Sequence, residues 1–229
     1  MVFFGSVNTL HFKMLKVITV ISNTEEPGFK LLGESLVKHG WDTTALAVQW
    51  RGFGTKLIAI YRYLQDNLEI DRFIFCDGHD VVALGPPVEF ERNLEHPDKM
   101  LVSAERGCWP PTMQQYASYY EPLEAHGWNY VNSGLYYTPT SIFMAMMERN
   151  MPKYESDDQE WLAMNFLFND EAEIRMDRNC NVFQSYSFVQ DDDYIYREGV
   201  LVNAKTCTTP CFVHGNGRTN MEKVYNLIK

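Results

Sequence analysis

Residues 72–80 read RFIFCDGHD, an apolar stretch that runs directly into two aspartates separated by a glycine and a histidine. The first five residues predict a buried strand, because short apolar runs of this length are typical of strands covered on both faces. Asp77 and Asp80 then stand just past the carboxyl end of that strand. Open α/β sheets bind ligands at this end of their strands, so the stretch predicts both a fold class and the place of a site.

The chain before this stretch alternates between strand and helix patterns. Short apolar runs predict strands at 16–21 and 44–50. Apolar residues at helical spacing predict helices over 27–39 and 55–68, the first of which is followed by a glycine. A strand–helix–strand–helix–strand series implies right-handed crossovers and parallel strands. We therefore predict an α/β fold that places both aspartates at the ligand-binding edge of the sheet.

The second half of the chain shows a less regular pattern. Strands are predicted at 100–105, 130–138, 173–177, 181–186 and 210–214. Helices are predicted at 141–150 and 157–168. The segment 109–128 is rich in Tyr, Pro and Gln and is predicted to be a loop or lid. Because no repeat or linker divides the chain, we expect a single domain over 14–229 after an N-terminal extension of residues 1–13.

The composition is that of a soluble globular protein, with 229 residues of which 45% are hydrophobic. The net charge of −10 argues against a general binder of nucleic-acid backbones. We expect several acids, namely Glu171, Glu173 and Asp191–Asp193, to be solvated. No apolar run is long enough for a transmembrane helix, and the first twelve residues make a poor signal peptide. Five cysteines without CxxC spacing favour free thiols, so we expect a cytoplasmic location.

Asp77 and Asp80 can converge on one hard cation, because the glycine between them lets the backbone turn tightly. The alternative is an aspartate-rich turn without an ion. His214 follows the last predicted strand and offers a neutral imidazole as a third ligand. The glycines that flank Asn216, of which Gly215 is the first, would let the backbone approach a phosphate. The alternative there is a plain turn, which Asn-Gly favours by itself.

A second acidic group lies at 156–159, where the sequence reads SDDQ. Ser156 and Gln159 have the spacing of a capping box, and acids in a first helical turn complement the helix dipole. Capping therefore explains the segment structurally. In addition to capping, Asp157 or Asp158 would have a functional role if its carboxylate held a substrate hydroxyl or accepted a proton.

Two aromatic segments supply further candidates. Glu105 stands at a strand end, and Trp109 follows it in a loop stiffened by prolines. Trp50 precedes a turn, and Lys56 opens a helix, where it can meet a phosphate. The alternative for both tryptophans is burial in the core. The chain has no GxGxxG, GxxxxGK[ST] or GxSxG motif, which argues against dinucleotide oxidoreductases, P-loop NTPases and α/β-hydrolases.

Taken in order, these segments resemble the glycosyltransferase domain of the procollagen lysyl hydroxylases and the related collagen glucosyl- and galactosyltransferases. The matching blocks are KVITVIS (16–22), WRGFGTK (50–56), FIFCDGHDVV (73–82), LVSAERGCWP (101–110), YVNSGLYY (130–137), DDQ (157–159), MDRNCNVFQSY (176–186) and TPCFVHGNG (209–217). All eight blocks occur in family order. The turn after Trp50 is shorter and less glycine-rich than in the family.

The resemblance implies a GT-A-like, Rossmann-type nucleotide-sugar-binding fold with a mixed central sheet. It implies a donor such as UDP-glucose or UDP-galactose and a Mn²⁺ ion held by Asp77, Asp80 and His214. The cofactor-binding positions that it implies are Trp50, Lys56, His79, Asn132, Gly215 and Asn216. Of these, Trp50 and Lys56 match donor-side positions, and Asn132 and Asn216 match sugar- or acceptor-side positions. The catalytic positions that it implies, on the sugar and acceptor side, are Glu105, Trp109, Asp157 and Asp158. His79 stands where the family usually has an aromatic residue that stacks near the uracil.

The leading functional hypothesis is a Mn²⁺-dependent transferase that moves a hexose from a UDP-sugar to a hydroxyl acceptor. The resemblance points to hydroxylysine or galactosyl-hydroxylysine in collagen-like protein. A second hypothesis within the same class is transfer to hydroxymethylated pyrimidines in DNA. A different class is a non-catalytic module that binds nucleotide-sugars. Since the chain ends at Lys229, without the further domains of the animal enzymes, we expect a free-standing viral or bacterial transferase.

Overall fold

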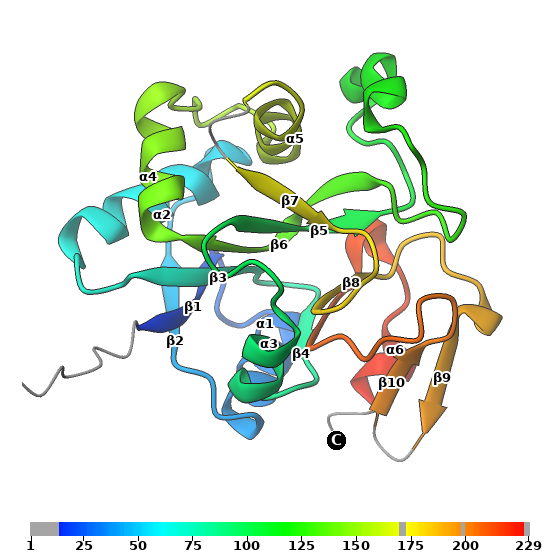
Figure 1. Cartoon of the computed structure of the whole chain (residues 1–229). Helices are drawn as coiled ribbons and strands as arrows, with labels where there is room; N and C mark the ends of the chain where they lie inside the picture. Colours follow the sequence, from blue (N-terminus) through cyan, green and yellow to red (C-terminus); the bar gives the residue numbers. More distant parts are fainter. Residues whose placement is uncertain (1–13, 170–172, 198–199, 227–229) are drawn as a thin grey trace, which may run out of the picture.

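The computed structural model of the chain describes residues 14–169, 173–197 and 200–226 (Figure 1). The extension expected at residues 1–13 and the acid Glu171 lie outside the described residues. Within the described part of the chain, no helix has the length and apolar character needed to cross a membrane. All five cysteines carry free thiols.

A mixed six-stranded sheet forms the centre of the molecule, with the strand order β2-β1-β3-β6-β5-β7. Its strands are β1 (Leu15–Ile21), β2 (Thr43–Ala47), β3 (Arg72–Asp77), β5 (Met100–Glu105), β6 (Tyr130–Pro139) and β7 (Ile174–Asp177). The three strands predicted from the N-terminal alternation, β1, β2 and β3, are parallel to one another. Strand β6 runs antiparallel to both of its neighbours, so the sheet is mixed, and the expected fold class is confirmed.

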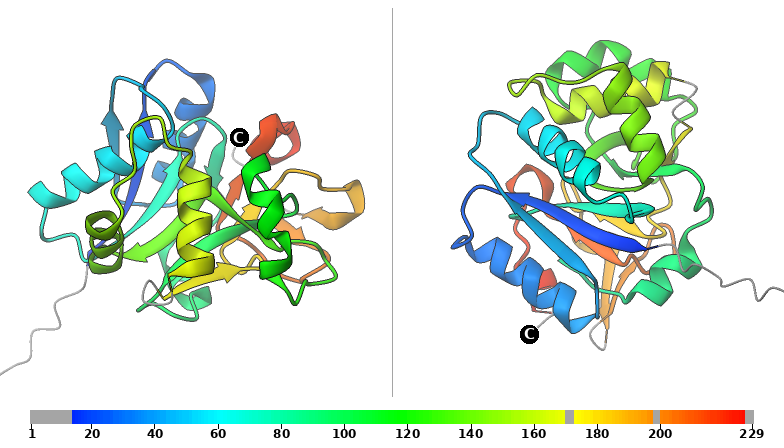
Figure 2. Two further views of the ribbon diagram at one scale, coloured as in Figure 1. Left: turned by 90° about the horizontal axis from the view of Figure 1, so that it is seen from above. Right: turned by 90° about the vertical axis from the view of Figure 1, so that its left-hand side faces the viewer.

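Helices cover both faces of this sheet (Figures 1 and 2). One face carries α2 (Gly54–Asp66), α4 (Thr140–Arg149) and α5 (Asp158–Phe168), and the other carries α1 (Pro27–Lys38) and α3 (Pro87–Asn93). Side chains alternate between the two cores along β3: Phe73 and Phe75 face the first group of helices, whereas Ile74 faces the second. The aspartates that follow β3 therefore start from a strand that is fixed on both sides.

A second, three-stranded sheet lies beside the first and has the order β4-β11-β8. It comprises β4 (Val81–Ala83), β8 (Phe183–Ser185) and β11 (Phe212–His214). Strand β11 runs antiparallel to β4, with His214 opposite Val81. This pairing brings the end of the chain next to the turn that carries Asp80, so it decides the geometry of the site.

The structure differs from the sequence-based expectation mainly in short elements. The predicted loop 109–128 contains a 3-10 helix, η1 (Pro111–Tyr120), which is held by the buried side chains of Met113 and Tyr120. The unpredicted elements are β4, α3, the antiparallel pair β9 (Tyr194–Arg197) and β10 (Val200–Asn203), and α6 (Glu222–Tyr225). Most of these elements have only three or four residues, which is too short for periodicity to show.

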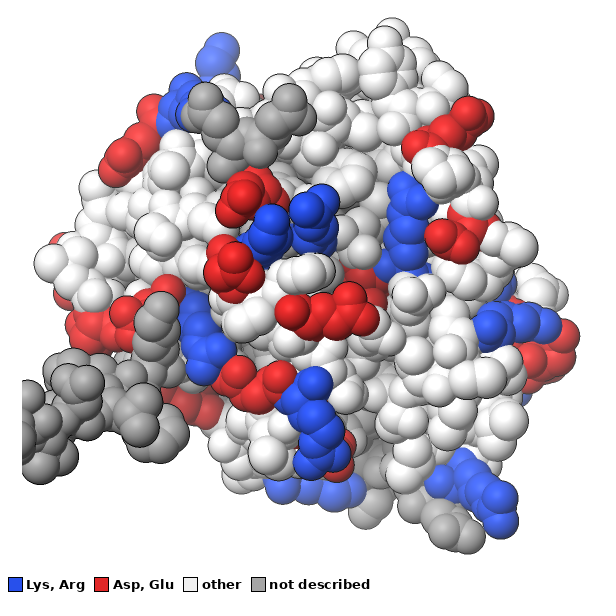
Figure 3. Space-filling view, viewed as in Figure 1, with Lys and Arg blue, Asp and Glu red and all other residues white. Residues whose placement is uncertain are grey.

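The expectation that Asp191–Asp193 is solvated is wrong for Asp193. Its side chain is 2% exposed and forms a 2.6 Å ion pair with Arg106, while Asp191 remains on the surface. Asp193 also accepts the backbone N–H of Gln190, which closes a turn before β9. On the face seen in Figure 3, acidic and basic side chains are interspersed, and no single basic area dominates.

Candidate active site

Asp77, Asp80 and His214 meet at the seam between the two sheets. Asp77 ends β3, Asp80 lies in the turn to β4, and His214 ends β11. One ligand atom from each lies within 4.8 Å of the others. The imidazole Nε2 of His214 is 3.2 Å from Asp80 Oδ1 and 3.7 Å from Asp77 Oδ2. The three side chains predicted as a ligand set are therefore brought together by the fold.

Asn132 orients the imidazole of His214. The Nδ1 atom donates a 2.9 Å hydrogen bond to Asn132 Oδ1, which leaves Nε2 facing the carboxylates. Gly134 makes room for the ring, because a Cβ atom built on it would lie 2.0 Å from the imidazole Cε1. Two carboxylates and an imidazole whose second nitrogen is fixed by a hydrogen bond are a donor set suited to a divalent cation such as Mn²⁺.

The same contacts shift the protonation of His214 and Asp80. Burial works against a charged imidazole, but the nearby Asp80 and Asp77 carboxylates outweigh it and raise the pKa of His214. Burial works against the Asp80 carboxylate too, but the imidazole lowers the pKa of Asp80 below its usual value. A cation at this position would thus compete with a proton on His214.

Lys56 joins the cation-ligand set to the start of α5. Its Nζ atom lies 2.8 Å from Asp77 Oδ1 and 2.6 Å from Asp158 Oδ2, and its side chain is 7% exposed. Burial disfavours the ammonium, but the two carboxylates prevail and raise the pKa of Lys56. The Lys56 ammonium is thus paired inside the protein with two carboxylates.

The two adjacent aspartates of the SDDQ segment have different surroundings. Asp157 is the N-cap of α5 and accepts the backbone N–H of Glu160 at 2.9 Å. The predicted capping by Ser156 is wrong: its hydroxyl instead accepts the backbone N–H of Lys153. Asp158 is buried and directed to Lys56. Only Asp158 of the pair is therefore connected to the ligand set.

Glu105, at the end of β5, is buried and held by three side-chain amides. Its Oε1 atom accepts hydrogen bonds from Gln159 at 2.6 Å and Asn132 at 3.2 Å, and its Oε2 atom accepts one from Asn216 at 2.8 Å. Burial raises the pKa of Glu105 to about 6, although all three amides act in the opposite direction. Glu105 can therefore exchange a proton near neutral pH.

The segment after β11 is fixed by contacts within the protein. Gly215 donates its backbone N–H to the Asp80 carbonyl at 2.7 Å, so this amide is not available to a phosphate as the glycine pattern suggested. Asn216 is buried, and its side-chain Oδ1 accepts the backbone N–H groups of Tyr186 and Ser187. These residues hold Asp80 and Glu105 in place.

A cleft of about 420 Å³ opens beside the ligand set. Its lining consists of Val20, Ser22, Trp50, Phe53, Lys56, Asp77, Gly78, His79 and Asp80. The exposed rings of Trp50 and Phe53 contact each other edge to face, so burial in the core is not the role of Trp50. Trp50, Lys56 and His79 are thus brought to one cleft, as expected for donor-side residues.

Trp109 is 57% exposed, so the core is not its environment either. Its backbone carbonyl accepts a hydrogen bond from Gln159, which also holds Glu105. Gln159 and Phe53 are site residues that the sequence reasoning did not single out. Two indications of these roles are present in the sequence: Gln159 follows two aspartates, and Phe53 lies in the turn after Trp50.

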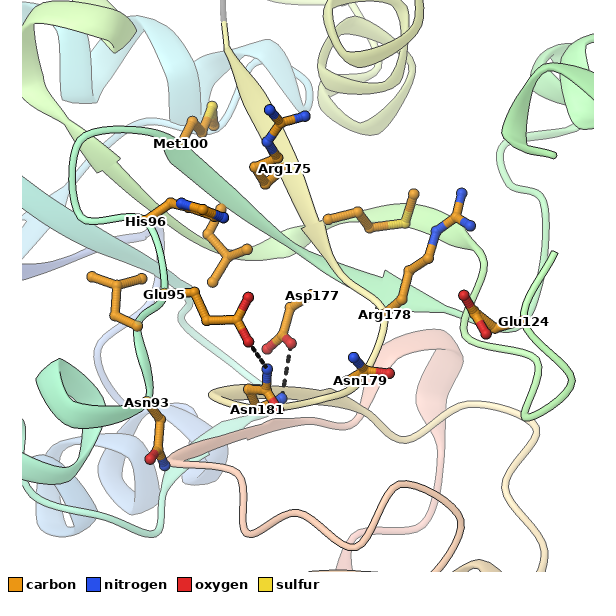
Figure 4. Close-up of a pocket in the computed structure, with 13 residues that line it drawn as sticks. Asn93, Glu95, His96, Met100, Glu124, Arg175, Asp177, Arg178, Asn179 and Asn181 are labelled. Atoms are coloured by element: carbon orange, nitrogen blue, oxygen red, sulfur yellow. Dashed lines mark hydrogen bonds between the residues drawn. The ribbon is translucent and has the colours of Figure 1, made fainter. Parts of the chain in front are cut away.

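A further cavity of about 260 Å³ lies against the edge strand β7 (Figure 4). Asp177 lies in it and accepts the backbone N–H groups of Asn181, Val182 and Phe183, which fixes the turn after β7. Burial raises the pKa of Asp177 to about 6. None of the predicted site residues lines this cavity, so we assign the Asp177 contacts to the fold.

Both the sequence and the fold are similar to those of known proteins. Residues 11–228 match the family model described as the PLOD GT domain. The human multifunctional procollagen lysine hydroxylase and glycosyltransferase is 27% identical over 92% of this chain and 31% of its own length. An uncharacterised protein of Acanthamoeba polyphaga mimivirus is 27% identical over 82% of this chain and 40% of its own length. The chain thus spans less than half the length of these relatives.

The fold is also similar to a solved structure, a glycosyltransferase involved in the glycosylation of the major capsid of PBCV-1. The TM-score is 0.56 at 10% sequence identity, and the similarity covers 93% of this chain and 98% of the other. At this identity the similarity concerns the fold. The shared architecture is the GT-A type.

Proposed function

The chain belongs to the PLOD GT-domain family, and from this premise we propose that it is a Mn²⁺-dependent glycosyltransferase using UDP-glucose or UDP-galactose. The hexose would pass to a hydroxyl group of an acceptor. The observation that carries the proposal is the convergence of Asp77, Asp80 and His214 at the edge of an aromatic cleft. We assign this activity to one domain over residues 14–229.

The cleft residues fit a nucleotide-sugar donor. Trp50, Phe53 and His79 offer rings for packing against a base or a ribose. Asp77, Asp80 and His214 would hold a Mn²⁺ ion, which when bound supplies positive charge to the leaving diphosphate. The ion pair with Lys56 fixes the position of the Asp77 carboxylate, one of these three ligands. Such preformed charges cost no reorganisation during the reaction.

Glu105 is our candidate for the group that accepts the acceptor's proton. Its carboxylate is aligned by Asn132, Gln159 and Asn216, and its pKa of about 6 lies close to neutral pH. A base with such a pKa is ionised at pH 7 and still accepts a proton from a hydroxyl during transfer. Buried Asp158 is a second carboxylate within the same network, joined through Lys56.

For the acceptor we propose hydroxylysine or galactosyl-hydroxylysine in collagen-like protein. The support is the family and the name of the human relative, a procollagen lysine hydroxylase and glycosyltransferase. One observation favours the alternative of hydroxymethylated DNA. Arg51, Arg62 and Lys153 line an open cavity of about 560 Å³ beside the Trp50 loop, a locally basic surface on an acidic chain.

The experiment that tests the transferase proposal measures UDP release from UDP-glucose and UDP-galactose with and without Mn²⁺. We expect Mn²⁺-dependent release that Asp77→Ala and Asp80→Ala each reduce by at least about 100-fold, because each removes a ligand. Asp191→Asn, which changes an exposed acid outside the ligand set, is the matched control. Full release by both ligand variants would contradict the proposed site.

The acceptor is tested by offering radiolabelled donor to three probes. These are a hydroxylysine peptide, a galactosyl-hydroxylysine peptide and duplex DNA containing 5-hydroxymethylcytosine. Label in either peptide supports the protein acceptor, and label in the DNA alone supports the alternative. Tight UDP binding that does not depend on Mn²⁺, with no label in any probe, would instead indicate a non-catalytic module.

A further inference from the structure

The loop that carries Trp50 and Phe53 borders two cavities. Trp50 and Phe53 line the cleft beside the cation-ligand set, whereas Arg51, which stands between them in the chain, lines the open cavity of about 560 Å³. The two rings are 42% and 54% exposed. Core packing does not hold rings that are this exposed, so the position of the loop depends on its other contacts.

Two glycines seat the loop on the segment before α5. Gly52 has a φ of +132°, which favours glycine, and a Cβ atom built on it would lie 2.3 Å from the Tyr154 carbonyl oxygen. A Cβ atom built on Gly54 would lie 2.0 Å from the Lys153 carbonyl oxygen. Gly54 also donates its backbone N–H to the Tyr154 carbonyl at 3.1 Å. The loop therefore lies directly against the backbone of residues 153–154.

Arg51 and Tyr154 add a side-chain contact to this seat. The guanidinium carbon Cζ of Arg51 lies 3.8 Å from the centroid of the Tyr154 ring. The backbone N–H of Arg51 also donates a 3.1 Å hydrogen bond to the hydroxyl of Thr55 in the first turn of α2. A guanidinium at this distance over a ring face is attracted to the ring, and the attraction does not need the tyrosine hydroxyl. Arg51 and Tyr154 thus form a clamp on the loop.

The clamp has a rigid base, because Tyr154 leads directly into the start of α5. Asp158, four residues later, pairs with buried Lys56 at 2.6 Å. Gln159 donates a 2.6 Å hydrogen bond to Glu105. A segment tied to buried charged groups has little freedom to move, so the Tyr154 ring can hold the more exposed loop in place.

We propose that Arg51 and Tyr154 are positioning residues that hold the Trp50 and Phe53 rings at the candidate donor cleft. This inference rests on the proposed function. Without the clamp, the loop occupies the position that a donor needs for a smaller fraction of the time. The apparent donor affinity falls with that fraction, whereas a saturating donor restores the position. The clamp therefore acts on the KM for the UDP-sugar and leaves kcat nearly unchanged.

The first test measures kcat and KM with the UDP-sugar that the unaltered protein uses. Tyr154→Ala should raise the KM for this donor about three- to tenfold and change kcat less than about twofold, the effect of one lost cation–π contact. Tyr154→Phe keeps the ring and should retain both constants. Calorimetric titration with Mn²⁺ should give the same affinity in all three proteins, because the cation-ligand set is unaltered.

A double-mutant cycle tests whether the two clamp residues act as a pair. Arg51→Ala should raise the donor KM as much as Tyr154→Ala does, and the double variant should be no worse than either single variant, since each change removes the same contact. Arg92→Ala removes one positive charge from an exposed position on α3 and should leave the KM unchanged. Effects of Arg51→Ala and Tyr154→Ala that simply add would overturn the clamp.

A third test follows the loop without measuring activity. Trypsin cleaves after arginine, and mass spectrometry can follow cleavage of the bond between Arg51 and Gly52 in the native protein. Tyr154→Ala should speed this cleavage at least about threefold, because proteolysis follows the population of the open segment. Cleavage that is equally faster at all trypsin sites would show a global loss of stability and would contradict a local clamp.

The outcomes distinguish this inference from the proposed function. An unchanged donor KM in Tyr154→Ala, or a fall in kcat as large as the rise in KM, overturns the inference alone. No Mn²⁺-dependent UDP release by the unaltered protein overturns the proposed function, and the inference falls with it.

Discussion

Two acidic centres of the candidate site are stabilised in different ways. Asp77 and Asp158 share a fixed cation, the ammonium of Lys56, which is paired with both. Glu105 is surrounded instead by the amides of Asn132 and Gln159, which donate hydrogen bonds. In both centres these partners offset only part of the effect of burial, so the pKa values of Asp158 and Glu105 are both raised.

The difference matches the chemistry that each centre is suited to. A carboxylate binds a cation in its ionised form, and the Lys56 ammonium lies 2.8 Å from Asp77 Oδ1. A group that exchanges a proton needs a pKa near the working pH, and burial raises that of Glu105 to about 6. Asn132 joins the two centres, since it binds both His214 and Glu105.

The largest effect is expected from Lys56→Met. It leaves the buried Asp158 and the partly exposed Asp77 without their shared cation, and breaking a buried pair costs about 3–5 kcal/mol in unfolding free energy. Urea denaturation measures this loss. Lys30→Met breaks an exposed pair with Glu25 and should cost less than about 1 kcal/mol.

A further substitution shows whether charge or shape causes the Lys56 effect. Adding Asp158→Asn to Lys56→Met removes one of the two stranded charges, so part of the lost stability should return. Equal stabilities of Lys56→Met and the unaltered protein would show that the ammonium does not stabilise this centre.

The next effect in size concerns the connection between the centres. Asn132→Leu removes the acceptor that fixes Nδ1 of His214. Loss of such a partner typically weakens metal affinity about 10–100-fold, and calorimetric titration with Mn²⁺ measures it. Asn165→Leu, a buried asparagine within α5 that bonds the Trp161 carbonyl, is the control for a buried amide. If Asn132→Leu bound Mn²⁺ as well as the unaltered protein, the two centres would be independent.

The smallest effect is a shift in the pH profile caused by Gln159→Ala. Glu105 must be ionised to accept a proton, so kcat should fall as the pH drops through about 6. Gln159 stabilises the ionised form, and its removal should raise the pKa of Glu105 by about one unit. The acidic limb of the profile should then move to higher pH.

The profile is measured at saturating Mn²⁺, so that protonation of His214, whose pKa is raised, does not enter through metal binding. Gln115→Ala, which changes a glutamine on η1 that bonds the Thr112 carbonyl, should leave the limb in place. An acidic limb that does not move in Gln159→Ala would exclude Glu105 as the group that titrates.

The sequence predicted best those features that depend on neighbours in the chain. The strand at 72–76 and the aspartates after it were evident, because a buried strand and its end are local patterns. The residues alone left His214 as either a third ligand or part of a plain turn, and the resemblance favoured the ligand, since pairing of β11 with β4 joins segments about 130 residues apart. Hydropathy along the chain does not encode such pairings.

Partners of buried charged groups were the least predictable. Lys56 looked like a phosphate-binding residue at a helix start, yet Asp158, 102 positions later, neutralises it. Asp193 looked like part of a solvated acidic run, yet Arg106 from another segment pairs with it. A lysine or an aspartate is usually found on the surface, so the residue type alone does not predict a buried ion pair. The tertiary fold brings the residue of opposite charge next to it.

Strand β11 also determines when the site can exist. It lies between β4 and β8 and contributes His214, so the candidate ligand set is incomplete until β11 has been added to a sheet begun at residue 81. Contacts of such sequence separation form slowly and late in folding. During synthesis, a nascent chain that has emerged only to β8 has both aspartates but lacks the histidine. The candidate cation-ligand set is therefore complete only once this three-stranded sheet has closed.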